Sequence, residues 1–157
     1  MWLIFLFRLT FTENDCWVSY LPLPHIYEHF GYWFSVATGM KVGIYSGDVK
    51  KLKFDMQVLK PTVFPSVPRL LNKVFDAMQI KINDLRGFKK WIAEKAIKTK
   101  SKKYKKTGQN RNWFFDTVVF KKMRAAMGGK LKFISSGSAP INAYTLNFLR
   151  IAFSCNV

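Results

Sequence analysis

A run of small residues at 135–139, SSGSA, is the stretch of this sequence best suited to hold a ligand. It follows a short apolar run and precedes an amphipathic segment at 143–153, so we expect it at the end of a strand. In an open α/β sheet, ligands bind beyond the carboxyl ends of the strands. Small side chains there leave backbone N–H and C=O groups open to a flat partner such as a nucleobase, and Pro140 stiffens the exit. The alternative is a plain connection from strand to helix, with small residues present for packing.

A second candidate is His25, which follows a short β-rich run at 16–21. Pro24 fits the first turn of a helix, and Gly39 is placed to end that helix. A histidine at a helix N-terminus just after a strand is where an α/β site would place a polar contact. A lone histidine at such a position can equally serve the helix itself. The residues alone leave both roles open.

The elements that must position these residues alternate between strand and helix. Strand-like runs, each followed by helical periodicity, occur at 16–21, 41–46, 62–64 and from 130 onward. The first helix is expected to bury a face with spacings of four, four and three, formed by Ile26, Phe30, Phe34 and Ala37. This order predicts an α/β fold, with a mainly parallel sheet flanked by helices.

The formal net charge of +17 is concentrated in one segment. Residues 89–106 contain nine lysines and one acid, Glu94. Because lysine and polar residues dominate 98–112, and Tyr104 is the only aromatic there, we expect a solvated, non-specific basic loop. Contact with anionic lipid or nucleic acid is the alternative. Apart from this Lys-rich excursion no domain boundary is evident, so residues 1–10 are read as an atypical start and 11–157 as one domain.

Several other site chemistries have no support in the sequence. Cys16 and Cys155 lie far apart without CxxC or histidine spacing, which argues against a zinc site or a disulfide framework. GGK at 128–130 lacks the earlier glycine of a Walker loop, and no GxGxxG occurs. The apolar run at 2–7 is too short to span a bilayer and lacks the basic region of a secretory signal. We therefore expect an intracellular protein without a signal peptide or transmembrane helix.

Several stretches, taken in order, resemble the AMP-forming long-chain acyl-CoA synthetases. They are SYLPLPHIYEH at 19–29, YSGDVKKL at 45–52, LKPTVFPSVPRLLNKVFD at 59–76, and ISSGSAPI with LNFLRIAF at 134–153. The match runs from about residue 9 to residue 157, and the ordered set is more specific than any single block. The resemblance implies that 11–157 is part of an AMP-binding, or adenylating, domain.

This resemblance implies a reaction in two steps in a complete enzyme. A fatty acid carboxylate attacks the α-phosphate of ATP to give acyl-AMP and pyrophosphate, and the thiol of coenzyme A then takes the acyl group. ATP, Mg²⁺ and coenzyme A are the implied cofactors, and a long-chain fatty acid in a buried tunnel is the implied substrate. Relatives often associate with membranes of the endoplasmic reticulum, mitochondria or peroxisomes. Peripheral membrane association is thus more in keeping with the resemblance than nucleic acid binding.

The same resemblance suggests roles for particular residues. His25 matches the histidine of the LPLxHxxE block, near the acyl and adenylate site. Phe64 falls where bacterial relatives carry a tryptophan that gates the fatty acid tunnel. Phenylalanine has no indole N–H, so a hydrogen-bonded gate of that type is not expected here. The segment along the adenine corresponds to Ser136, Gly137, Ser138, Ala139 and Pro140, and no residue is matched to a metal ligand.

Other parts of the family's machinery have no counterpart in these 157 residues. They are the Ser/Thr/Gly-rich phosphate loop, the GYGxTE block with its metal-holding glutamate, and the lysine of a mobile C-terminal domain. We therefore expect an internal fragment that makes no acyl-CoA alone and is prone to aggregate. Three functions stay open: part of a long-chain fatty acid–CoA ligase, a non-catalytic relative that binds acyl chains or nucleotides, and a small basic protein that binds nucleic acid or a membrane surface.

Overall fold

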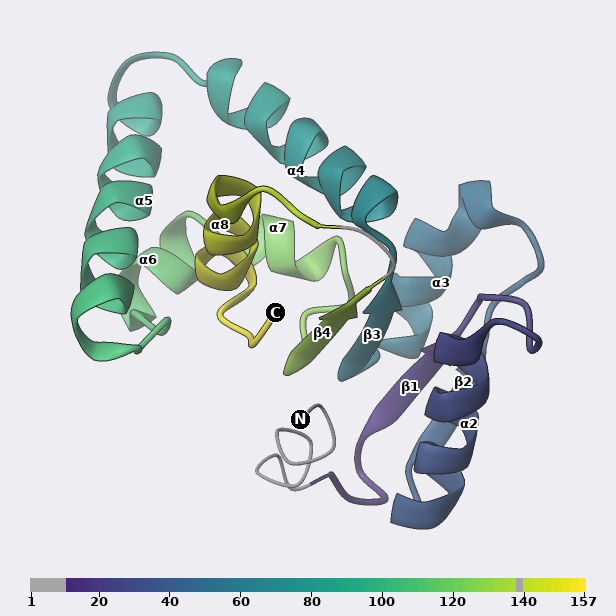
Figure 1. Ribbon diagram of the computed structural model, residues 1–157. Helices are drawn as coiled ribbons and strands as arrows, with labels where there is room; N and C mark the ends of the chain where they lie inside the picture. Colours follow the sequence, from purple (N-terminus) through teal and green to yellow (C-terminus); the bar gives the residue numbers. More distant parts are fainter. Residues whose placement is uncertain (1–10, 138–139) are drawn as a thin grey trace.

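The computed structural model describes residues 11–137 and 140–157, and it shows a four-stranded sheet with helices on both faces (Figure 1). The strands are β1 (Cys16–Ser19), β2 (Lys41–Ile44), β3 (Val63–Ser66) and β4 (Phe133–Ser136). Their order across the sheet is β2-β1-β3-β4, and every pairing is parallel. The predicted α/β fold with a mainly parallel sheet is therefore confirmed.

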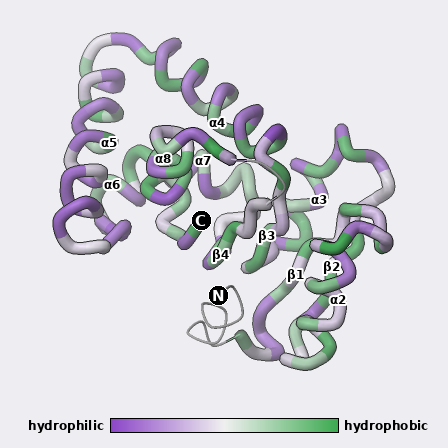
Figure 2. The backbone as a smooth tube through the Cα atoms, in the orientation of Figure 1, coloured by the Kyte–Doolittle hydropathy of each residue, from purple (hydrophilic) through white to green (hydrophobic). Residues whose placement is uncertain are grey.

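The sheet separates two hydrophobic cores because successive side chains of a strand point to opposite faces. The smaller core lies under helix α2 (Ile26–Thr38), and its strand residues are Trp17, Val63 and Phe133. The larger core lies on the other face, and its strand residues are Val18, Phe64 and Ile134. Figure 2 shows the hydrophobic stretches of the central strands between these two layers. Neighbouring residues of one strand thus serve different cores.

The remaining helices cover the larger core. The short 3-10 turn η1 (Val49–Lys51) leads into α3 (Leu52–Leu59), and α4 (Pro68–Asn83) starts with a proline in its first turn. The later helices are α5 (Gly87–Thr107), α6 (Trp113–Val118), α7 (Lys121–Ala125) and α8 (Ala143–Phe153). In Figure 1, α8 lies between α5 and β4, so α5 forms an outer margin of the molecule.

The expected apolar face of the first helix is wrong for Ile26, Phe30 and Ala37, whereas Phe34 is half-buried against the smaller core. The buried residues of α2 are Glu28, Gly31 and Ser35, on the side opposite the predicted apolar face. Ile26, the first residue of that face, is 72% exposed, and Phe30 is also exposed. The cause is Trp17 of β1: its ring lies against Gly31, where an added Cβ would come within 1.9 Å of the indole. Only a face of small or hydrogen-bonding residues fits against that ring.

The expected basic loop at 98–112 is also wrong for residues 98–107, which continue α5 as a helix. Lysine is a good helix former, so a Lys-rich segment need not be irregular. Lys100 is only 1% exposed and pairs with Asp116 of α6, and it also donates to the carbonyl oxygen of Ile151 and to Ser154 Oγ. This buried ammonium anchors α5 to α6 and to the C-terminal end of α8.

Candidate functional site

The carboxyl ends of the strands meet at one edge of the sheet, as in other parallel α/β folds. Ser66 at the end of β3 is paired in register with Ser136 at the end of β4. Tyr20, just after β1, lies on the same face of the sheet as Phe64, and the two rings stack with centroids 5.7 Å apart and planes at 28°. The hydroxyls of Ser66 and Ser136 and the phenol of Tyr20 therefore lie near the edge where parallel α/β folds bind their ligands.

His25 is the N-cap residue of α2. Its Nδ1 atom accepts a hydrogen bond from the backbone N–H of Tyr27 at 3.3 Å, and the side chain is half-buried. This contact gives the histidine the helix-serving role that the sequence left open. No described residue hydrogen-bonds to its Nε2 atom, so that ring nitrogen is the one still able to meet a ligand.

Tyr27 joins the start of α2 to the turn after β4. A Cβ built on Gly137 would come within 1.9 Å of the Tyr27 hydroxyl oxygen, so the phenol lies directly against the backbone of Gly137. The ring of His25 lies 6.1 Å from that of Tyr27, centroid to centroid. The structure therefore brings His25 and Gly137 to the same edge through Tyr27. Sequence reasoning missed Tyr27, because the contact spans more than a hundred residues and no local pattern marks it.

Only part of the predicted adenine segment can be placed. Ser136 ends β4, Gly137 follows it, and Pro140 is exposed, whereas Ser138 and Ala139 lie outside the described residues. Among the described residues, Ser136 Oγ is buried and has no hydrogen-bond partner. A buried hydroxyl without a partner costs free energy unless a ligand or water satisfies it. The unpaired Ser136 hydroxyl therefore makes the end of β4 a candidate binding position for a polar group of a ligand.

Tyr20 and Glu28 are two further polar residues at this edge that the sequence did not single out. Glu28 is fully buried, and it accepts hydrogen bonds from Trp17 Nε1 at 3.3 Å and from the backbone N–H of Leu21 at 3.4 Å. Burial raises the pKa of Tyr20 to about 12, and the nearby Glu28 charge adds to this, while Ser66 opposes it. The phenol lies close to Ser66 without a well-formed hydrogen bond among the described groups.

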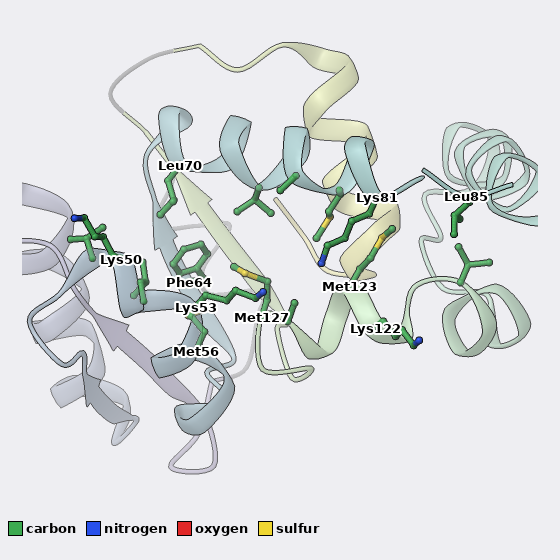
Figure 3. A pocket seen from close by; sticks show the side chains of 17 residues that line it. Lys50, Lys53, Met56, Phe64, Leu70, Lys81, Leu85, Lys122, Met123 and Met127 are labelled. Carbon is green, nitrogen blue, oxygen red and sulfur yellow. The ribbon is translucent and has the colours of Figure 1, made fainter. Parts of the chain in front are cut away.

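A large apolar pocket lies on the Phe64 side of the sheet (Figure 3). Its volume is about 470 Å³, within the usual range for small-molecule sites. Phe64 lines it, and the apolar lining continues along α3, α4, α7 and the residues just after α7 with Met56, Leu70, Val74, Met78, Met123 and Met127. The predicted tunnel residue is therefore in the wall of a pocket, although it is also a core residue with only 1% exposure.

Phe64 contributes to both this pocket and the strand-end edge. One side of its ring stacks on Tyr20 at the edge, and the residue also lines the pocket. Methionine side chains, which adapt their shape to flexible ligands, form part of the pocket lining. Phe64 therefore links the apolar pocket to the edge that holds Tyr20 and Ser136.

Four lysines surround the pocket: Lys50, Lys53, Lys81 and Lys122. In Figure 3 the ammonium groups of Lys53 and Lys81 face the open space between α3 and α4. Positive charge around an apolar pocket favours an amphiphile with an anionic head over a neutral one. The pocket therefore combines an apolar lining with positively charged side chains around it.

In residues 11–137 and 140–157, no three of the His, Cys, Asp and Glu side chains are grouped to bind a metal ion. Within the same residues, none of the helices combines the length and hydrophobicity that a bilayer crossing requires.

A parallel α/β sheet with polar groups at its strand-end edge belongs to a class of folds that bind ligands there, and comparison with known proteins gives the family. The family model "AMP-binding enzyme" matches residues 2–157, and the chain belongs to that family. Long chain acyl-CoA synthetase 7, peroxisomal, of Arabidopsis thaliana is 40% identical over 147 residues. Long-chain-fatty-acid–CoA ligase 5 of Rattus norvegicus is 39% identical over 144 residues, and ligase 1 of Homo sapiens is 36% identical over 142. The resemblance to long-chain acyl-CoA synthetases is confirmed.

These matches cover most of this chain but little of the relatives. The Arabidopsis and rat matches span 94% and 92% of the chain and 21% of each relative, so the chain spans about a fifth of their length. The adenylation domain of the carboxylate reductase from Mycobacterium chelonae superimposes with a TM-score of 0.64 at 20% identity, over 89% of this chain and 19% of that one. A carboxylic acid reductase didomain from Segniliparus rugosus, solved with AMP, gives 0.59 at 16%, over 90% of this chain and 17% of that one. These structures support the fold.

Proposed function

We propose that this chain is the part of a long-chain fatty acid–CoA ligase that holds the acyl chain and one side of the adenylate. The observation that carries the proposal is the apolar pocket lined by Phe64, whose ring also stacks on Tyr20 at the strand-end edge with Ser136 and Gly137. The whole reaction would join a fatty acid to AMP and then transfer the acyl group to coenzyme A. The 36–40% identity to ligases of this class supports that reaction.

In this proposal the pocket binds the alkyl chain by removing it from water. Each buried methylene contributes about 0.8 kcal/mol, so several of them outweigh the loss of chain entropy. The lysine rim attracts the carboxylate during entry. Phe64 lines the pocket next to the strand-end edge, so in this proposal its ring volume limits the space that the acyl chain can occupy. Because phenylalanine has no hydrogen-bond donor, any opening of this gate is a matter of ring packing against Tyr20.

The strand-end edge would receive the adenosine part of ATP. ATP supplies the activated α-phosphate that the carboxylate attacks. In our proposal Ser136 Oγ gains its missing hydrogen bond from the nucleotide, the backbone of Ser136 and Gly137 lies along the adenine, and His25 Nε2 faces the acyl-adenylate. Tyr27 holds the turn in place through its contact with Gly137. The described residues offer no cluster for Mg²⁺, so we derive no step through the metal or through coenzyme A.

A matched pair of tryptophan substitutions tests the acyl pocket. Ala77 lines the pocket and is exposed, so Ala77→Trp should fill it without disturbing the core. Ala125 is an exposed helix residue outside this pocket, which makes Ala125→Trp the control. We expect Ala77→Trp to weaken binding of a fluorescent long-chain fatty acid at least tenfold, and Ala125→Trp to leave it within twofold. Equal binding by both variants would contradict the proposal.

Activity of the chain is tested separately. We expect no acyl-CoA from the purified 157 residues with palmitate, ATP and coenzyme A, because loss of even one electrostatic donor typically costs about 10²–10³ in rate and several are absent from this sequence. Fatty acid binding without turnover is also what a non-catalytic relative would show. Measurable turnover by these residues would overturn the assignment of the chain as one part of the ligase.

We also propose peripheral membrane association for the protein.

A further inference from the structure

The outward side of α5 carries a continuous stripe, formed by Phe88, Trp91, Lys95, Lys98, Lys102 and Lys105. The spacings are three, four, three, four and three, so the six side chains follow one side of the helix. All six are exposed; Phe88 and Trp91 are 71% and 52% exposed. At 1.5 Å per residue the stripe is about 26 Å long. We call it the α5 stripe.

The opposite side of α5 is packed against the protein. Ala93, Ala96 and Lys100 are its buried residues, and α8 is the helix that α5 contacts most. Lys100 fixes this orientation through its contacts with Asp116 and Ser154. Since α5 lies at the outer margin in Figure 1, the stripe faces away from the sheet. Figure 2 shows strongly hydrophilic turns along this helix.

The charge of the stripe is one-sided. It contains four lysines and no acid, and Glu94 is the single acid of α5, beside the stripe. Neither ion pair of the described residues involves a stripe lysine. Like charges spaced along one helix side repel each other and destabilise the isolated helix. This arrangement indicates an extended anionic partner.

The aromatic end of the stripe narrows the class of partner. Phe88 and Trp91 stack with ring centroids 5.7 Å apart and planes at 19°, and Lys95 Nζ lies 4.5 Å from the centre of the Trp91 ring. Tryptophan beside lysine favours a membrane–water interface, where the ring enters the headgroup layer and the ammonium meets lipid phosphate. A binder of single-stranded nucleic acid would instead present separate aromatic faces along its basic track.

We propose that the α5 stripe docks the protein on an anionic lipid bilayer. The four lysines together supply the electrostatic attraction for reversible binding, and Phe88 and Trp91 add apolar contact. This deepens the membrane association of the proposed function by naming its surface. Leu85 lines the acyl pocket three residues before Phe88, so the docked helix places one end of that pocket beside the bilayer. A bilayer is a source of long-chain fatty acids.

Two charge-matched quadruple variants test the location of the surface. The stripe variant changes Lys95, Lys98, Lys102 and Lys105 to Gln. The control variant makes the same change at four exposed lysines elsewhere, which are Lys41, Lys51, Lys73 and Lys130. Co-sedimentation with phosphatidylcholine vesicles, with and without phosphatidylserine, is measured at 0.1 M salt. We expect the unmodified chain to bind only the phosphatidylserine vesicles, the stripe variant to lose at least tenfold in partitioning, and the control to stay within threefold. Equal losses in both variants would overturn the proposal, because net charge alone would then explain binding.

Trp91 provides a second readout that does not depend on charge. We expect phosphatidylserine vesicles to shift the tryptophan emission of the chain to the blue, and Trp91→Phe to remove most of that shift. An unchanged shift in Trp91→Phe would overturn contact through α5, as would double-stranded DNA or RNA that binds the chain more tightly than the vesicles do at the same salt. Fatty acid binding by the stripe variant is measured in parallel. If it is retained, a loss of vesicle binding concerns the stripe and leaves the acyl pocket standing.

Discussion

Replacing Lys100 with methionine tests how α5 is held to the rest of the protein. The ammonium group contacts Asp116 Oδ1 and the carbonyl oxygen of Ile151, and it donates to Ser154 Oγ at 3.0 Å. It also lies 4.8 Å from the centre of the Phe120 ring. Methionine retains a flexible apolar side chain but removes the charge and all the donors. Three acceptors would then lose their shared donor inside the protein.

We expect Lys100→Met to lower the free energy of unfolding by about 3–5 kcal/mol, the usual cost of removing one partner of a buried ion pair. That is a large share of the about 5–15 kcal/mol that holds a typical domain. Burial lowers the pKa of Lys100, although the Asp116 carboxylate opposes the shift. Because the charge is costly to bury, Lys100→Met combined with Asp116→Asn should recover about 2 kcal/mol of the loss.

Urea unfolding followed by circular dichroism measures these differences at one pH and one salt concentration. Lys102→Met is the matched control, because Lys102 is exposed two residues further along the same helix, and it should change stability by no more than about 0.5 kcal/mol. If Lys100→Met is as mild as Lys102→Met, the ammonium is not buried between α5 and α8. The reasoning about this helix would then be refuted.

Three further outcomes follow from the site and the cores. In the complete ligase, Phe64→Ala should shift preference toward longer fatty acids in a competition assay without changing the ATP requirement, whereas a purely structural Phe64 predicts only lower stability. Gly137→Ala should weaken ATP binding at least tenfold by calorimetry, because the new Cβ meets the Tyr27 hydroxyl. Adding Tyr27→Ala to Gly137→Ala should restore part of the ATP affinity. Unchanged ATP affinity in Gly137→Ala would count against a role of this turn in nucleotide binding. Burial raises the pKa of the Cys155 thiol to about 12 from 9.0, so the folded chain favours the protonated form and loses stability as pH rises from 9 to 12. Cys155→Ala should therefore lose less stability than the unmodified chain between pH 8 and pH 10.5, and equal losses in urea unfolding would contradict this.

The strands and the last helix could be predicted from local sequence. Short β-rich runs, bounded by proline and glycine, locate all four strands to within a few residues. The amphipathic segment at 143–153 coincides with α8, whose start is fixed by Asn142: its side chain accepts from the N–H of Tyr144 at 2.8 Å. Parallel order follows because each strand is separated from the next by a helix. These features depend on neighbours in sequence.

The parts that sequence reasoning missed depend on contacts between distant residues. Periodicity correctly found the apolar side of α2 but not that Trp17 would take the opposite side, where its N–H meets the Glu28 carboxylate. Lysine content correctly indicated solvation for most of α5 but could not show that Lys100 turns inward to a carboxylate 16 residues away. Likewise, Gly137 was singled out for its small size, whereas Tyr27, which contacts it, was not.

The outward apolar side of α2 and the net charge of +17 have opposite effects on the protein in solution. Ile26, Trp33 and Val36 are exposed, and Ile44 of the edge strand β2 is 76% exposed, so two copies could bury these surfaces against each other. At low ionic strength the like charges keep the molecules apart, but above about 0.1 M salt the Debye length falls below about 10 Å and the repulsion acts only at contact. The chain should therefore resist self-association best in buffer of low ionic strength, and added salt should increase the turbidity of its solutions. A salt series for vesicle binding consequently needs a vesicle-free tube at every concentration, because self-association would sediment the protein just as lipid does.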